Sequence, residues 1–127
     1  MVVNTHFEHT NDAARERQAE VLAAYLQKWA GYPLILTGDF NTKPGTTAYN
    51  IVRGGGVENC SSLARIKTSP ATAVTFNNYG KSNSVIDFVF TNQNAIVVED
   101  YRVCDEQIDG NYPSDHLPVL VEYIITK

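Results

Sequence analysis

Hydrophobic and polar residues alternate at the start of the chain. Val3, Thr5 and Phe7 fall on one face of the segment, and Asn4 and His6 fall on the other. This period of two predicts a β-strand. Because a strand does not usually begin at an initiator methionine without a preceding turn, we expect it to be an internal strand of a larger fold.

The pattern then changes to the period of a helix. Asn11 and Asp12 offer an N-cap, and no glycine or proline interrupts the chain from Ala13 to Ala30. Gly31 would end the helix, and Pro33 would prevent its continuation. Apolar residues recur at helical spacing at Ala14, Val21, Leu22, Tyr25, Leu26 and Trp29. The pattern therefore predicts an amphipathic helix.

The remaining segments predict further strands and a short helix. The run Leu34–Leu36 is apolar at every position, which is typical of a strand buried between layers. Thr46 or Thr47 can cap the short helix, and residues 60–72 are expected to form a loop with room for one helical turn. Further strands are expected over residues 73–76, 84–90, 95–103 and 117–126. This order predicts a single domain, residues 1–127, of the α/β or α+β class with a mostly antiparallel second half.

The composition indicates a folded chain. Its 127 residues are 43% hydrophobic and 19% charged, which excludes wholesale disorder. No apolar run is long enough for a transmembrane helix, and no signal peptide precedes the first strand, so the localisation stays open. The formal net charge of −4 leaves no broad basic surface for nucleic acid, although a metal ion could supply local positive charge. Cys60 and Cys104 lack a CxxC spacing and are expected to be thiols, or one disulfide if the chain is exported.

Three polar clusters fall at ends of predicted strands: Asn4–His6, Gly38–Asn41 and Ser114–His116. The second follows the buried strand at its carboxyl end, where open α/β sheets bind ligands. In an extended segment Asp39 and Asn41 point in one direction, and the glycine before them lets backbones approach closely. Taken alone, each cluster is also compatible with an ordinary polar turn.

A carboxylate lies inside an apolar strand at Asp87, on the face that Val85 and Val89 share. Burying this group is costly unless it is paired. One interpretation is a structural carboxylate bonded to the backbone or to a base such as Arg102. The other is a carboxylate that orients an imidazole, with His116 as its partner, as in catalytic Asp–His pairs.

Four short motifs occur in a fixed order: NTHFEH, GDFN, IDFVF and SDHLPV. Together they resemble the later signature motifs of the endonuclease/exonuclease/phosphatase superfamily, which has the DNase I-like fold. The resemblance covers nearly the whole chain but only the C-terminal half of the family domain. It implies half of a four-layer α/β/β/α sandwich, with a mixed sheet and one long helix packed on it. It also implies a metal-dependent phosphoesterase that hydrolyses phosphodiesters or phosphomonoesters with an activated water.

The resemblance implies a catalytic role for His6, Asp39, Asn41, Asp87 and His116. His6 would contact or protonate a phosphate oxygen. Asp39 would position or deprotonate the attacking water, and Asn41 would hold that water or the phosphate. His116 would contact the phosphate or act as a base, oriented by Asp87.

The resemblance also implies a substrate and a metal site. Asn4, His6 and Asn41 would bind the phosphate, and Asp115 and Asp39 would bind the metal. Hard oxygen ligands of this kind suit Mg²⁺ or Mn²⁺. Nucleic acids, inositol phosphates and phospholipid head groups are the implied substrates.

The early strand with the glutamate that is the family's principal metal ligand has no counterpart in this sequence. Two interpretations therefore stay open. The chain is a truncated phosphoesterase domain, or it is a catalytically impaired fragment or binding module that keeps a phosphate-shaped pocket.

The missing half also implies an uncovered surface. Without it, the apolar faces formed by Leu34–Leu36, by Val85 and Val89, and by residues 117–125 would be exposed. We expect a homodimer in which two copies pack sheet to sheet, because two-fold association is the commonest closed symmetry.

Overall fold

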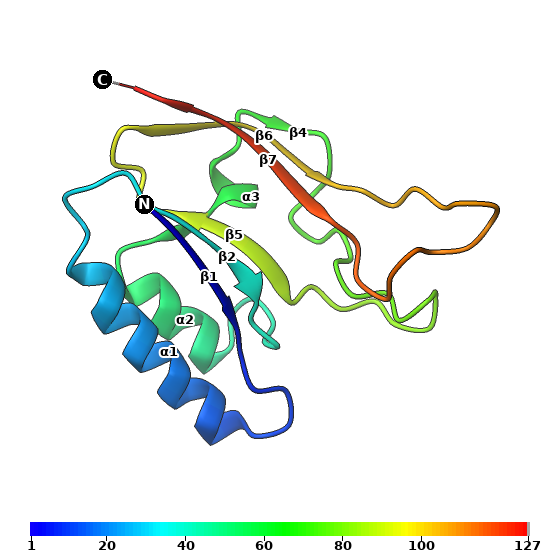
Figure 1. Cartoon of the computed structure of the whole chain (residues 1–127), viewed down its shortest axis with the longest axis horizontal. Coiled ribbons are helices and arrows are strands. Elements are labelled where there is room, and N and C mark those ends of the chain that lie inside the picture. The colour runs from blue at the N-terminus through cyan, green and yellow to red at the C-terminus, as the bar shows by residue number, and fades with distance from the viewer. Residues whose placement is uncertain (127) are drawn as a thin grey trace.

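The computed structural model describes residues 1–126 as two β-sheets and a layer of helices (Figure 1). The first sheet has the strand order β1-β2-β5-β3, and the second has the order β4-β6-β7. The strands of the first sheet are β1 (Val2–His6), β2 (Ile35–Asp39), β3 (Glu58–Asn59) and β5 (Asp87–Thr91). The strands of the second are β4 (Ile66–Lys67), β6 (Ile96–Val103) and β7 (Val119–Ile125). The expected mixed α/β class is confirmed, with two mixed sheets in place of one.

Helix α1 (Asp12–Gln27) connects β1 to β2, which run parallel. Its N-cap is Asn11, whose side chain accepts a hydrogen bond from Ala14 N at 3.0 Å. The helix ends at Gln27, before the predicted end at Ala30. A helix between two parallel neighbouring strands is the expected crossover connection.

The face that α1 buries is built mainly from small residues, because a second helix lies close to it. Ala19, Ala23 and Leu26 are buried, whereas Val21 and Tyr25 from the predicted apolar stripe are 63% and 45% exposed. Helix α2 (Thr47–Gly54) packs beside α1 (Figure 1). A Cβ on the residue that follows α2, Gly55, would lie 2.9 Å from the Cα of Ala23. The expected single long helix is therefore one of two helices in this layer.

Two hydrophobic cores lie on opposite faces of the first sheet. Along β5, Phe88 and Phe90 belong to the core under the helices, whereas Val89 packs against the core under the second sheet. This second core contains Tyr101 of β6 and Cys60, which begins the one-turn helix α3 (Cys60–Leu63). The described residues thus form three layers in the order helices, first sheet, second sheet.

The second sheet covers a face that the sequence predicted to be exposed. All residues of Leu34–Leu36 are at most 8% exposed, and Val85 and Val89 pack against the two cores. The predicted exposure of these two segments is therefore wrong, because the helices cover Leu34, Leu36 and Val85, and the second sheet covers Val89. Large exposed apolar side chains of the second sheet are Ile66, Tyr123, Ile124 and Ile125.

The segment between β4 and β5 is irregular. In place of the predicted strand over residues 73–76, Phe76 makes isolated bridges to Ser84 and to His116. Both cysteines are free, with Cys60 buried and Cys104 half-buried. Across residues 1–126, no helix combines the length and apolar character needed to cross a membrane.

Candidate active site

The strand register places His6, Asp39 and Asp87 side by side at one end of the first sheet, and we call these three residues the carboxylate row. β1 and β2 are parallel with His6 opposite Asp39, and β2 and β5 are antiparallel with Asp39 opposite Asp87. The last residues of β1 and β2 and the first residue of β5 therefore lie side by side. This is the carboxyl end of the parallel pair, where α/β proteins bind ligands.

A glycine makes this pairing possible. A Cβ built on Gly38 would lie 2.1 Å from the carbonyl oxygen of Thr5 on the neighbouring strand. Any other residue would collide with backbone that has no room to move. The residue before Asp39 must therefore be glycine for β1 and β2 to keep their spacing.

His116 reaches the row from the loop that precedes β7. Its Nδ1 lies 3.0 Å and 2.9 Å from the two carboxylate oxygens of Asp87, and its Nε2 lies 3.9 Å from Asp39 Oδ2. From the other side, His6 Nε2 lies 3.4 Å from the same oxygen. With Nδ1–H donating to Asp87, the Nε2 of His116 is left facing Asp39. One carboxylate is thus flanked by two imidazoles.

Asp87 is a carboxylate in a partly dry environment, with a side chain only 19% exposed. Burial raises the pKa of Asp87, while hydrogen bonds with His116 and Thr75 oppose this shift. The nearby charge of Asp39 adds a further, smaller rise to this pKa. The structure therefore pairs Asp87 with an imidazole, and the alternative base, Arg102, has an exposed side chain.

Thr75 supports Asp87 and is absent from the residues that the sequence singles out. It is completely buried, and its hydroxyl oxygen accepts hydrogen bonds from the N–H groups of Ile86 and Asp87, both at 3.0 Å. Its carbonyl accepts from the N–H of Leu117 at 2.6 Å, which ties the His116 loop to the same residue. The only sequence signal is a threonine inside the apolar run AVTF, which predicts a strand.

Two asparagines lie beside this row. Asn41 adopts a left-handed conformation with φ 47°, its N–H donates to Asp39 Oδ1 at 2.8 Å, and its Nδ2 donates to the Phe7 carbonyl at 2.9 Å. Asn4 is exposed on β1, and its Nδ2 donates to the hydroxyl of Thr37 at 2.8 Å. Asn41 is therefore bound directly to the carboxylate row, and Asn4 lies further back along β1.

Asp115 lies in the loop of His116 but outside the row. Its backbone carbonyl accepts hydrogen bonds from the N–H groups of Asn77 and Asn78, at 2.9 Å and 3.0 Å. Its Oδ1 lies 3.4 Å from the hydroxyl of Ser114. The residue is half-buried, and its backbone joins the two loops that border the site.

Among the described residues, two carboxylates and one imidazole form a close group that could hold a metal ion. The ligand atoms that Asp39, Asp87 and His116 offer all lie within 4.8 Å of one another. Asp115 is not part of this group. Carboxylate oxygens suit Mg²⁺ or Mn²⁺, but the Asp87 carboxylate is already bonded to His116. The residues present therefore fit one side of a divalent-cation site centred on Asp39.

The chain is similar to known phosphoester-cleaving proteins. It is 25% identical to the CCR4-Not complex 3'-5'-exoribonuclease subunit Ccr4 of Emericella nidulans, over 73% of this chain and 18% of that protein. It matches an endonuclease/exonuclease/phosphatase family protein of Bacteroides thetaiotaomicron with a TM-score of 0.85 and 26% identity, over 99% of this chain and 50% of that one. A mannosyl-6-phosphatase of the same organism gives a TM-score of 0.79 and 26% identity, over 97% and 50%. The chain thus spans about half the length of these solved relatives.

A family comparison agrees with these matches. Residues 2–116 match the sequence model of the Endonuclease/Exonuclease/phosphatase family. The matched range includes the whole carboxylate row, both asparagines and the His116 loop. The similar structures have the DNase I-like fold that the four motifs imply. The chain therefore belongs to the endonuclease/exonuclease/phosphatase family.

Proposed function

We propose that this chain is part of a divalent-metal-dependent phosphoesterase and carries the histidine–carboxylate side of its active site. The observation that carries the proposal is the His116–Asp87 pair set against Asp39 at the end of the first sheet. Membership of a family that generally depends on divalent metal ions supports it. The exoribonuclease subunit and the mannosyl-6-phosphatase among its relatives support a phosphoester substrate.

The arrangement provides groups for hydrolysis by water. Phosphoester cleavage needs an activated water, neutralisation of charge on the phosphate and help for the leaving oxygen. Asp39 orients the water and accepts its proton. The imidazoles of His6 and His116 flank Asp39 and contact phosphate oxygens, while Asp87 holds His116 in one tautomer.

The two asparagines and Asp115 complete the proposed roles. Asn4 and Asn41 bind the phosphate, and Asp115 joins Asp39 as a metal ligand. A bound Mg²⁺ or Mn²⁺ would neutralise charge on the nonbridging oxygens. Because few oxygen ligands lie near Asp39 among residues 1–126, we expect a further ligand from outside this stretch of chain.

The test is metal-dependent hydrolysis of a generic phosphodiester, with single-stranded RNA and mannose 6-phosphate as further substrates. We expect a chelator, Asp39→Ala and His116→Ala each to abolish turnover. The matched control is His9→Ala, which removes an imidazole that is 73% exposed and outside the row. Turnover that survives both substitutions would place the chemistry elsewhere.

The second candidate is a binding module without turnover, which the half-length match to solved relatives favours. A module of this kind would keep the phosphate contacts of the carboxylate row. Inorganic phosphate would then shift the imidazole NMR signals of His6 and His116, with no hydrolysis of any substrate. Hydrolysis by the same purified chain would exclude this candidate.

We also propose that the chain forms a homodimer through its second sheet. Support comes from three consecutive residues near the end of its outer strand β7, Tyr123, Ile124 and Ile125, which are 42%, 51% and 60% exposed. An apolar outer strand of this kind favours pairing with another chain. Size-exclusion chromatography with light scattering should give twice the mass of the chain, and a soluble monomer at micromolar concentration would overturn the proposal.

A further inference from the structure

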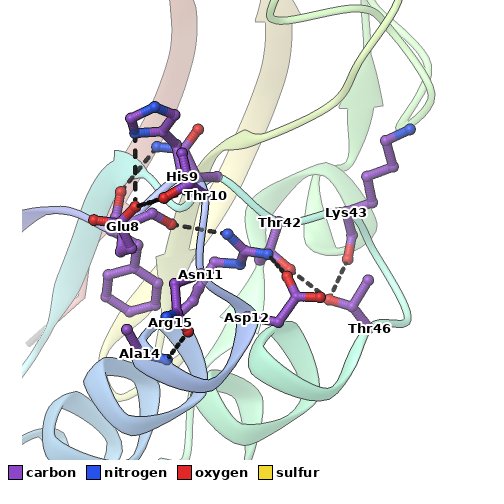
Figure 2. Close-up of polar contacts among 12 residues, drawn as sticks. Glu8, His9, Thr10, Asn11, Asp12, Ala14, Arg15, Thr42, Lys43 and Thr46 are labelled. Atoms are coloured by element: carbon purple, nitrogen blue, oxygen red, sulfur yellow. Dashed lines mark hydrogen bonds and ion pairs between the residues drawn. The ribbon is translucent and has the colours of Figure 1, made fainter.

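The loop that leaves β1 is held by two side chains of α1. The N–H of Glu8 donates to Gln18 Oε1 at 2.8 Å, and the Glu8 carbonyl accepts from Arg15 Nη1 at 2.9 Å. Figure 2 shows Arg15 reaching from α1 towards Glu8. Residues three apart share one side of a helix, so a single helix face fixes both backbone polar groups of this loop residue.

The residue before Glu8 joins this loop to the candidate active site. The N–H of Phe7 donates to the backbone carbonyl of Asp39, and the Phe7 carbonyl accepts from Asn41 Nδ2, both at 2.9 Å. Because a carbonyl can only accept a hydrogen bond, the Asn41 amide must turn its nitrogen, and not its oxygen, towards the Phe7 carbonyl. The position of the Phe7 carbonyl therefore sets the orientation of the Asn41 amide.

Arg15 differs from an ordinary surface arginine. Its side chain is only 11% exposed, and its second nitrogen, Nη2, is paired with Asp12 (Figure 2). Arg17, on the same helix, is 77% exposed and pairs with Glu20 at the surface. A charged donor bonds a carbonyl more strongly than a neutral one, so the loop loses a strong anchor if Arg15 is replaced.

We propose that Arg15 and Gln18 are positioning residues of the candidate active site. By holding Glu8, they fix the Phe7 carbonyl, and this carbonyl orients the Asn41 amide next to Asp39. The inference rests on the proposed function in giving Asn41 a contact with the phosphate. Through Glu8 and Phe7, the two helix residues thereby act on the geometry of the site from a distance.

Side-chain amide NMR signals test the proposal without any need for turnover. Arg15→Met removes the donor and keeps an apolar stem, and Arg17→Met is the matched control. Gln18→Met removes the acceptor, whereas Gln18→Glu keeps one. We expect the Asn41 Nδ2 signals to shift, and their exchange with water to quicken by about tenfold, in Arg15→Met and less in Gln18→Met. Arg17→Met and Gln18→Glu should leave both unchanged.

Kinetics provide a second measurement where turnover is found. Arg15→Met should lower kcat by about tenfold with little change in KM, because a small misplacement of a reacting group costs rate. Arg15→Lys, which keeps one donor, should recover part of this loss. A purely structural role would instead lower the unfolding temperature and leave the Asn41 signals in place.

The outcomes separate this inference from the proposed function. Unchanged Asn41 signals in both Arg15→Met and Gln18→Met would overturn it, whatever their stability or activity. Absence of turnover in the unaltered chain would count against the proposed function alone, because the amide signals still decide the positioning role. If Arg15→Met does not fold, Gln18→Met carries the same decision.

Discussion

The two sides of the candidate active site are built in different ways. His6, Asp39 and Asp87 lie at the ends of paired strands, so the backbone register itself brings them together. His116 lies in an irregular loop and is placed by side chains, namely the Asp87 carboxylate and the ring of Phe76, whose centroid lies 4.9 Å from that of the imidazole. Changes to the strand backbone should therefore act on stability, and changes to the side-chain contacts that place His116 should act on chemistry.

The strand side is tested at the glycine where β1 and β2 approach. Gly38→Ala places a Cβ 2.1 Å from the Thr5 carbonyl oxygen, so the strands must separate. We expect the free energy of unfolding to fall by about 3 kcal/mol, measured by urea denaturation. Gly31→Ala is the control, because a Cβ there meets nothing within 4 Å. Equal stability of the two variants would show that register does not depend on this contact.

The side-chain placement of His116 is tested at Asp87, the strand carboxylate that holds the imidazole. Asp87→Asn keeps the size of the side chain but removes the charge that orients the imidazole. We expect kcat to fall by about 100-fold with little change in stability, since residues that orient a catalytic group typically contribute this much. Steady-state kinetics and thermal unfolding of the same preparation check both parts. A large loss of stability would instead show that Asp87 has a structural role.

The junction between the two sides is tested at Thr75. Thr75→Val keeps the shape of the buried side chain but leaves the N–H groups of Ile86 and Asp87 without their acceptor. We expect a loss of about 1–3 kcal/mol in the free energy of unfolding. Thr72→Val, at an exposed position of the same loop, should be nearly neutral. A neutral Thr75→Val would mean that water replaces the hydroxyl.

The pH dependence of stability sharpens the assignment of Asp87. Because burial raises its pKa above the ordinary 3.8, the folded chain holds a proton on Asp87 more tightly than the unfolded chain does. The resulting stabilisation is full below 3.8 and is lost as the pH rises through the raised pKa. The stability of the unaltered chain relative to Asp87→Asn should therefore decline over this window. A difference that is flat with pH would contradict the raised pKa.

The smallest effect is expected at the two cysteines, one in the core under the second sheet and one next to the loop that carries His116. Burial raises the pKa of the Cys60 thiol to about 12, whereas Cys104 is half-buried next to the loop that carries His116. Iodoacetamide at pH 8 should modify Cys104 in the folded chain and reach Cys60 only after unfolding. Peptide mass spectrometry measures both. Equal rates at the two thiols would show that the core under the second sheet opens readily.

The sequence predicts the strand side well because its signals are local. Alternation identifies β1, the apolar run identifies β2, and the glycine and carboxylate that follow mark the end where ligands bind. The roles of Asp39 and His116 still await the tests above. Thr75 and Arg15 escape prediction because their importance lies in contacts with residues far along the chain, such as Ile86, or across a loop to Glu8.

The sequence by itself determined the mixed α/β class, the first strands and helix, and the family to which the chain belongs. These follow from periodicity and from short motifs, both of which are properties of neighbouring residues. Only the tertiary structure decided that the helices bury Leu34 and Leu36, and that β6 and β7 fold over the opposite face of the first sheet, against Val89. It also placed His116 against Asp87, 29 positions apart in the chain, a pairing that the sequence offered only as one of two interpretations. Such long-range packing depends on which surfaces meet after folding, and no local pattern encodes it.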